Sequence, residues 1–200
     1  MKVIDSTAKT VVILASGPSL TQEQIDAALA SGYPTIAVNS TWEKMPTATM
    51  LYAGDFLWFK FNIAKVRAAK FKGEIWTQDN TVASRWPGIK RIRGTNRKGL
   101  GKDVIHINGN SGTQAINLAY LQGYRRIILL GFDMKLGPNG ERHHHKDHAH
   151  PMVQNQTFNQ WLDQLQDVAR DLEAEKCEVL NATPDSALKS FPLVDWKAVL

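Results

Sequence analysis

The sequence predicts one α/β domain in which helices cover both faces of a mostly parallel sheet, a three-layer architecture. Short apolar runs alternate with longer segments of helical periodicity along almost the whole chain. Several runs are apolar at every position and rich in β-branched residues, as in strands buried on both faces. Glycine, serine, asparagine and aspartate separate them. This alternation favours parallel strands joined by right-handed crossovers.

The first half of the chain contains four expected strands and two expected helices. The strands are 10–15 (TVVILA), 34–39 (PTIAVN), 49–53 (TMLYA) and 74–77 (EIWT). The first helix is expected over Gln22–Ala30, because Thr21 and Gln24 have the spacing of a capping box and Gly32 follows as a stop signal. The second is expected over 56–71, where basic residues are interleaved among apolar ones.

The second half begins with a weaker pattern. Residues 79–103 combine glycine and proline with basic residues, and we expect a mobile, basic connection there. Strands are then expected at 104–107, 126–131 and 178–180, helices at 111–122 and about 156–176, and loops at 134–152 and 181–186. The last helix has apolar residues at core spacing: Phe158, Trp161, Leu162, Leu165, Val168, Ala169 and Leu172. No repeat or linker divides the chain, so residues 1–200 are expected to form one domain.

Composition limits the classes of protein to which the chain can belong. Its 200 residues are 43% hydrophobic and 22% charged, which is typical of a globular domain and not of a disordered chain. No apolar run approaches the roughly 20 residues that cross a bilayer, and the N-terminus has no signal-peptide core. The single cysteine, Cys177, excludes an internal disulfide and is expected to be a buried apolar residue. We therefore expect a cytoplasmic protein with no membrane partner.

The middle of the chain is strongly basic. The net charge is +5 and the isoelectric point is near 9.3. The candidates for contact with nucleic acid are Arg85, Lys90, Arg91, Arg93, Arg97 and Lys98. Such a stretch suits a polyanion through phosphate neutralisation, but a solvated basic face has the same composition. Trp86 lies in this stretch and is a candidate for stacking on a base.

Small polar residues follow the expected strands or precede the expected helices. The candidate nucleotide-binding residues are Ser16, Gly17, Pro18, Ser19, Asn39, Asp55, Asn110, Ser111, Gly112, Thr183 and Ser186. Ligands of open α/β sheets bind at the carboxyl ends of the strands, and loops before helices present N–H groups to phosphate. Each loop alone could be a tight turn or a helix cap. Neither a Walker A motif nor G-x-G-x-x-G is present, which disfavours an ATPase or a dehydrogenase.

Five of the six histidines lie in one short segment, RHHHKDHAH at 142–150. This loop follows Asp133, which ends an expected strand, and histidine is the usual general base near neutral pH. The candidates for the catalytic base are His145, then His143, then His148, with Asp133 beside them. The alternatives are a metal site that includes Asp147 and a polar, exposed loop. No H-E-x-x-H or paired C-x-x-C spacing is present, so we assign no metal ligand.

Several of these segments together resemble a known group of Rossmann-like proteins. The segments are 14–20 (LASGPSL), Asn39, Gly112 and 128–134 (ILLGFDM), which resemble the bacterial family 42 sialyltransferases and the proteins around 6-hydroxymethylpterin pyrophosphokinase. Small uncharacterised bacteriophage proteins of this group are similar also at the histidine loop and at 183–188 (TPDSAL).

The resemblance implies a Rossmann-like fold and roles for particular residues. Gly17, Pro18, Ser19 and Asn39 would hold the nucleotide, Ser111 and Gly112 would lie beside its phosphate or ribose, and a histidine of the 143–148 loop would be the base. The tyrosines that assist the leaving phosphate in the sialyltransferases have no counterpart in the loop after Asp133.

Three functions are compatible with these residues. The first is a glycosyltransferase that uses a nucleotide-activated sugar without an obligatory metal, with a modified base in DNA considered as its acceptor. The second is a Mg²⁺-dependent phosphoryl or pyrophosphoryl transferase, in which Asp133 and Asp55 position the ion. The third is a nucleotide- or nucleic-acid-binding module without turnover. The sequence does not predict the oligomeric state.

Overall fold

A sheet of seven parallel strands forms the centre of the computed structural model, which describes residues 9–107, 109–145 and 157–200. The strand order is β5-β4-β3-β2-β1-β8-β9. The strands are β1 (Thr10–Leu14), β2 (Thr35–Val38), β3 (Met50–Tyr52), β4 (Glu74–Thr77), β5 (Ile89–Arg91), β8 (Arg126–Leu130) and β9 (Glu178–Asn181). A separate two-stranded ladder pairs β6 (Gly94–Thr95) with β7 (Ile105–His106).

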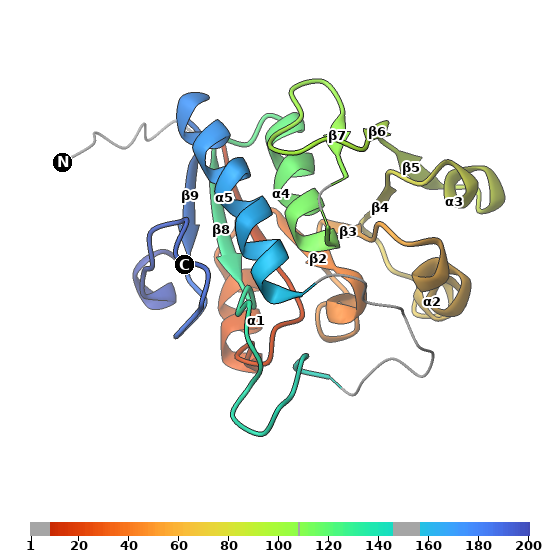
Figure 1. Cartoon of the computed structure of the whole chain (residues 1–200). Helices are drawn as coiled ribbons and strands as arrows, with labels where there is room; N and C mark the ends of the chain where they lie inside the picture. Colours follow the sequence, from red (N-terminus) through yellow and green to blue (C-terminus); the bar gives the residue numbers. More distant parts are fainter. Residues whose placement is uncertain (1–8, 108, 146–156) are drawn as a thin grey trace.

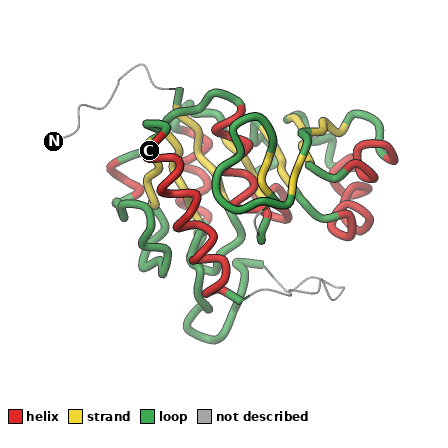
Figure 2. Tube along the Cα trace, turned by 45° about the horizontal axis from the view of Figure 1, so that its top comes forward, coloured by secondary structure: helices red, strands yellow, loops and turns green. Residues whose placement is uncertain are grey.

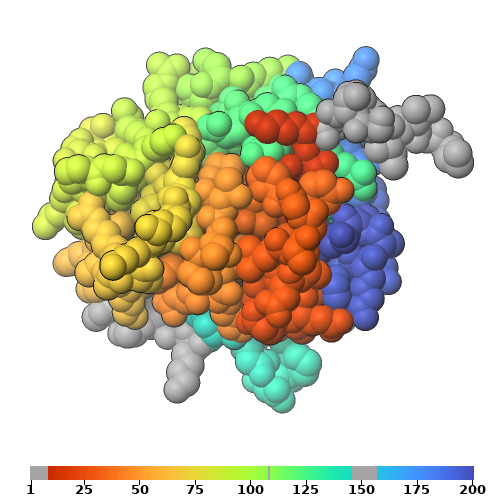
Figure 3. Space-filling view, turned by 180° about the vertical axis from the view of Figure 1, so that it is seen from behind, coloured from red at the N-terminus to blue at the C-terminus, as the bar shows by residue number. Residues whose placement is uncertain are grey.

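Helices cover both faces of this sheet (Figures 1 and 2). The helices are α1 (Gln22–Ala30), α2 (Phe56–Ala68), α3 (Asn80–Arg85), α4 (Ser111–Leu121) and α5 (Phe158–Ala174), with 3₁₀ turns at Asn39–Lys44 and Trp196–Ala198. Figure 1 shows α4 and α5 in front of the sheet, and Figure 3 shows the opposite face covered by the red and orange segments that include α1 and α2. The fold is therefore a Rossmann-like three-layer α/β fold.

The strands supply both cores because their side chains alternate between faces. In β1, Val11 and Ile13 pack with α4 and α5, while Val12 and Leu14 pack with α1 and α2. All four are fully buried. The continuous apolar run at this strand is thus explained by burial on both faces.

The order of the strands reverses beside β1. The chain proceeds from β1 outward through β2, β3, β4 and β5, and then returns to place β8 and β9 on the other side of β1. In sheets of this kind a crevice opens outside the carboxyl ends of the strands at the point of reversal. The loops after β1 and β8 meet there.

The prediction of a mobile connection over 79–103 is wrong. This segment contains α3, the edge strand β5 and β6. Ile89 of β5 is buried, and Trp86 packs against Phe56 and Phe59 of α2, with ring centroids 5.7 and 6.3 Å apart. A strand of three residues is too short to show the alternation typical of strands. The glycine and proline residues therefore determined the prediction for this segment. The strand expected at 104–107 also lies outside the main sheet, since β7 pairs only with β6 among the described residues.

Two other features bear on the expected environment of the chain. Cys177 is buried as expected, and burial raises the pKa of its thiol to about 11. Among the described residues, none of the helices has the length and apolar character needed to cross a membrane.

Candidate functional site

A cavity of about 380 Å³ opens where the strand order reverses. It lies between the loops that follow β1, β2 and β8 and the N-terminus of α4. Of the residues predicted from the sequence, it is lined by Ser16, Gly17, Pro18, Asn39, Asp55, Asn110, Ser111, Gly112, Asp133 and His143. The fold thus brings ten predicted residues from separate segments of the chain to one cavity.

The loop after β1 is held against the end of β8. Gly17 N–H donates to the carbonyl of Gly131 (2.9 Å), and Ser19 N–H donates to Oδ1 of Asp133 (3.1 Å). A Cβ atom at position 17 would lie 1.8 Å from Oδ2 of Asp133, so only glycine fits this contact. Asp133 is 4% exposed, and its burial raises the pKa of the carboxyl, an effect that the Ser19 N–H partly opposes.

The first turn of α4 forms the opposite wall. The Asn110 side chain caps the helix by accepting from Thr113 N–H (2.9 Å). Ser111 Oγ accepts from Gly54 N–H (3.2 Å), which ties this turn to the end of β3. The N–H groups of a first helical turn have no acceptor within the helix, and together with the helix dipole they favour an anion.

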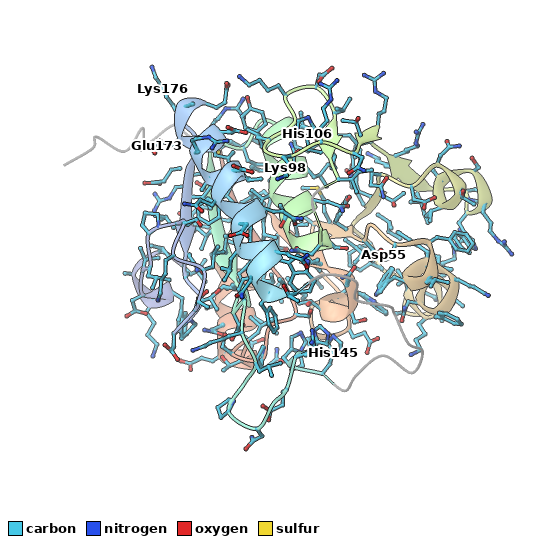
Figure 4. All side chains as sticks on the ribbon, viewed as in Figure 1. Asp55, Lys98, His106, His145, Glu173 and Lys176 are labelled. Carbon is cyan, nitrogen blue, oxygen red and sulfur yellow. The ribbon has the colours of Figure 1, made fainter. Side chains whose placement is uncertain are left out.

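The histidine loop packs against the loop that follows β1. His144 N–H donates to the carbonyl of Ser16 (3.0 Å), and Nδ1 of His143 lies 3.1 Å from Ser16 Oγ. His145 stacks on His143 with ring centroids 5.0 Å apart. Of the described histidines, His143 is the one that lines the cavity, with His145 against its ring. Figure 4 shows His145 in the lower part of the molecule, in the same view as Figure 1. His148 lies outside the described residues.

The ring of His144 is half-buried between the histidine loop and the turn after β2. Its Nε2 lies 3.4 Å from Thr41 Oγ1. Burial, followed by the positive charge of Lys44, lowers the pKa of His144 to about 3. His144 is therefore neutral at physiological pH and anchors the loop.

Among the lining residues that the sequence did not identify as site residues are two cations and two aromatic residues: Lys135, Arg142, Phe158 and Trp161. Lys135 pairs with Asp185 (2.5 Å), and the Arg142 guanidinium lies 5.4 Å from the ring centroid of Phe158. We expected Phe158 and Trp161 in the core, but they are half-buried because the first turn of α5 extends past the strand ends. Their position directly after the histidine loop was the available signal.

Other predicted residues support the cavity without lining it. Thr183 Oγ1 accepts from Phe132 N–H (2.9 Å), and Ser186 Oγ donates to the carbonyl of Phe132 (2.6 Å). Both residues are buried and fix the turn after β8. Ser19 contributes through its contact with Asp133.

Two carboxylates reach the cavity from different strands, Asp133 and Asp55. Asp55 is partly exposed, but loss of hydration around its carboxyl and, second, the negative charge of Asp79 raise its pKa. In the part of the chain that the structure describes, no group of three or more histidine, cysteine, aspartate or glutamate residues is arranged to hold a metal ion.

Two buried amide atoms in the cavity wall lack a protein partner. Among the described residues, neither Oδ1 of Asn39 nor Nδ2 of Asn110 has a hydrogen-bond partner. Asn39 also has a φ of 51°, a left-handed backbone conformation that residues other than glycine adopt uncommonly. One acceptor and one donor are thus available to a polar ligand in the cavity.

A larger cavity, of about 1650 Å³, lies along α5 and β9. None of the predicted site residues lines it. Its lining mixes side chains of both charges, and it contains no helix N-terminus. The smaller cavity is therefore the candidate site.

Fold and site together define an α/β protein of Rossmann-like type with a polar cavity at the reversal of strand order. No protein-family model matches the chain, and neither does any curated protein or any solved structure.

Proposed function

We propose that this protein transfers a glycosyl group from a nucleotide-activated sugar bound in the 380 Å³ cavity. One observation carries the proposal: an anion-binding helix terminus, two cations, an aromatic wall and a histidine converge on this cavity. Each feature matches one part of such a donor.

The phosphate end of the donor fits the α4 side. The first-turn N–H groups at Ser111 and Gly112 stabilise negative charge, and the small side chains allow phosphate to approach. Lys135 and Arg142 add positive charge on the facing wall. These two cations would stabilise the leaving phosphate, as the tyrosines do in the family that the sequence resembles.

The base of the nucleotide fits the aromatic side. Phe158 and Trp161 form an edge-to-face pair with ring centroids 5.6 Å apart, and both line the cavity. A planar base can stack on such a wall, while the Asn39 and Asn110 amides supply polar contacts.

His143 is the candidate base. Hydrogen bonding of its Nδ1 to Ser16 Oγ orients the ring. When Nδ1–H is the donor in this pair, Nε2 has the lone pair that accepts a proton from the acceptor hydroxyl. As the bond between sugar and phosphate breaks, the acceptor oxygen forms the new bond to the sugar, and its proton passes to His143.

A thermal-shift panel tests the proposal directly. Nucleoside mono-, di- and triphosphates and nucleotide sugars are compared, each with and without Mg²⁺. A ligand at about 100 times its dissociation constant stabilises by roughly 2.7 kcal/mol. We expect stabilisation by one nucleotide and its sugar conjugate without metal, and we expect Trp161→Ala to reduce it. No response to any member would contradict the proposal.

Two alternatives remain distinguishable. Asp55 and Asp133 both line the cavity, so stabilisation by ATP only in the presence of Mg²⁺ would favour a phosphoryl or pyrophosphoryl transferase. A binding module would respond to a nucleotide without consuming it. Release of nucleotide from the stabilising donor, lost in His143→Gln with unchanged stability, would establish turnover.

A further inference from the structure

Positive charge is concentrated in one part of the chain. Residues 56–102 contain twelve of the 24 lysines and arginines but only two of the nineteen acidic residues, Glu74 and Asp79. This part therefore has a net charge of +10, while the rest of the chain has −5, since the whole has +5. The net charge of +5 for the whole chain therefore conceals a strongly basic region and an acidic remainder.

The fold places these residues together. Residues 56–95 form α2, β4, α3, β5 and β6, which lie at one end of the sheet in Figure 1, opposite β9, and the loop 96–102 continues from there towards α5, where Leu100 N–H donates to Oδ2 of Asp171. We call this the basic end. Its outermost strand, β5, pairs with β4 alone, so its other edge has no strand partner among the described residues.

The cations of the basic end face solvent. The side chains Arg85, Lys90, Arg91, Arg93, Arg97 and Lys98 all belong to exposed residues. Lys90 pairs with Glu74 (2.5 Å) and Arg93 lies 3.8 Å from Asp103. In the described ranges, no ion pair involves Arg85, Arg91, Arg97 or Lys98.

Aromatic rings lie beneath some of these cations. The Arg85 guanidinium is 5.4 Å from the ring centroid of Trp86, and the Lys90 ammonium is 5.4 Å from that of Trp76. Both rings are half-buried. Trp86 is thus packed within the protein, which differs from its predicted role as an open stacking platform, but it holds Arg85 at the surface.

We propose that the basic end binds the phosphate backbone of nucleic acid. The cations without an ion pair are mostly arginines, whose planar guanidinium binds phosphate through two parallel hydrogen bonds. They are spread over α3, β5 and the loop after β6, as a polyanion with many phosphates requires. This inference does not depend on the proposed transferase activity, because Lys98 lies well apart from His145 in Figure 4.

The test measures binding of a labelled 20-nucleotide DNA, single-stranded and duplex, by fluorescence anisotropy from about 50 to 250 mM salt. Native protein is compared with Arg91→Gln/Arg97→Gln. The control is Lys9→Gln/Lys189→Gln, which removes the same charge outside the basic end. We expect the first pair to weaken binding about tenfold or more and to lower the salt slope by roughly two, and the control to change neither.

Three results would overturn the proposal. The first is no binding by native protein at about 150 mM salt, where even non-specific complexes have dissociation constants of about 10⁻⁴–10⁻⁶ M. The second is equal weakening by both double variants. The third is tighter binding to vesicles with phosphatidylserine than to DNA, which would identify a membrane surface as the partner. A nucleotide-induced thermal shift that persists in Arg91→Gln/Arg97→Gln separates this outcome from that of the catalytic proposal.

Discussion

Gly17 packs so closely against Asp133 that position 17 has no room for a side chain. The carboxylate of Asp133 occupies the space that a Cβ atom at position 17 would need, and Gly131 O would lie 2.4 Å from that atom. We expect Gly17→Ala to destabilise the protein by about 3 kcal/mol, because the loop after β1 must move. Urea unfolding measures this change.

Gly32 provides the matched control for this substitution. It has a φ of +76°, and no described atom lies within 4 Å of the place that a Cβ would occupy, so only backbone strain opposes alanine there. We expect Gly32→Ala to cost about 1 kcal/mol. An equal effect of the two variants would show that steric exclusion at Gly17 is unimportant.

His144 makes stability depend on pH. Its folded pKa of about 3 is below the unfolded value near 6.5, so the unfolded chain binds a proton that the folded protein does not. Stability contributed by this residue is present above about pH 6.5 and is lost as the pH falls towards 3. At pH 5 the loss is about 1–2 kcal/mol.

Thermal unfolding of native protein and His144→Gln between pH 4 and pH 8 measures this dependence. We expect the melting temperature of the variant to fall less between pH 7 and pH 5. Parallel curves would mean that His144 is protonated equally in both states.

The sequence predicted the polar part of the cavity better than its charged and aromatic part. Ser16, Asn39 and Ser111 were identified because strand-end loops must meet at one edge of a parallel sheet. Trp161 was missed because the helical period continues past the core, and periodicity does not indicate where a helix leaves the sheet. The choice between His143 and His145 depended on a loop path that residue types do not specify.

At the scale of elements, Asn117 of α4 acts as a clamp on the segment that contains β7. Its buried side chain accepts from Gly101 N–H (3.0 Å) and His106 N–H (2.9 Å) and donates to Gly101 O (2.8 Å). We expect Asn117→Ala to destabilise by about 2–3 kcal/mol, since three backbone groups lose their partner. Urea unfolding measures the change, and hydrogen exchange at Gly101 and His106 should accelerate.

Asn62→Ala is the control for this clamp. Asn62 is half-buried and donates to Trp58 O (2.8 Å) within its own helix. We expect a change below about 1 kcal/mol. Unchanged exchange at Gly101 in Asn117→Ala would contradict the clamp.

Elements whose ends are marked by capping residues were predictable from the sequence, and elements without such residues were not. Thr21 and Gln24 form both bonds of the capping box that their spacing predicted, and α1 has the predicted bounds. By contrast, β5 has three residues of which only Ile89 is buried. Its pairing with β4 decides its conformation, and that contact is not visible in the local sequence.

At the scale of the whole molecule, both hydrophobic cores share one sheet. Val11 and Val12 are neighbours in β1 but belong to different cores, so neither core can be lost while β1 stays paired on both sides. We therefore expect one cooperative unfolding transition. Calorimetry tests this, since the calorimetric and van't Hoff enthalpies should agree, and two resolved transitions would indicate separate units.

The position of Trp161 has an optical consequence. Of the six tryptophans, all of them in the described ranges, it is the one that lines the cavity, whereas Trp58 of α2 is fully buried. A base that stacks on the indole of Trp161 quenches its emission, while the emission of Trp58 stays shielded from solvent and ligand. The protein thus carries an intrinsic fluorescent reporter in the wall of the cavity, and occupancy of the cavity can be followed in unlabelled protein.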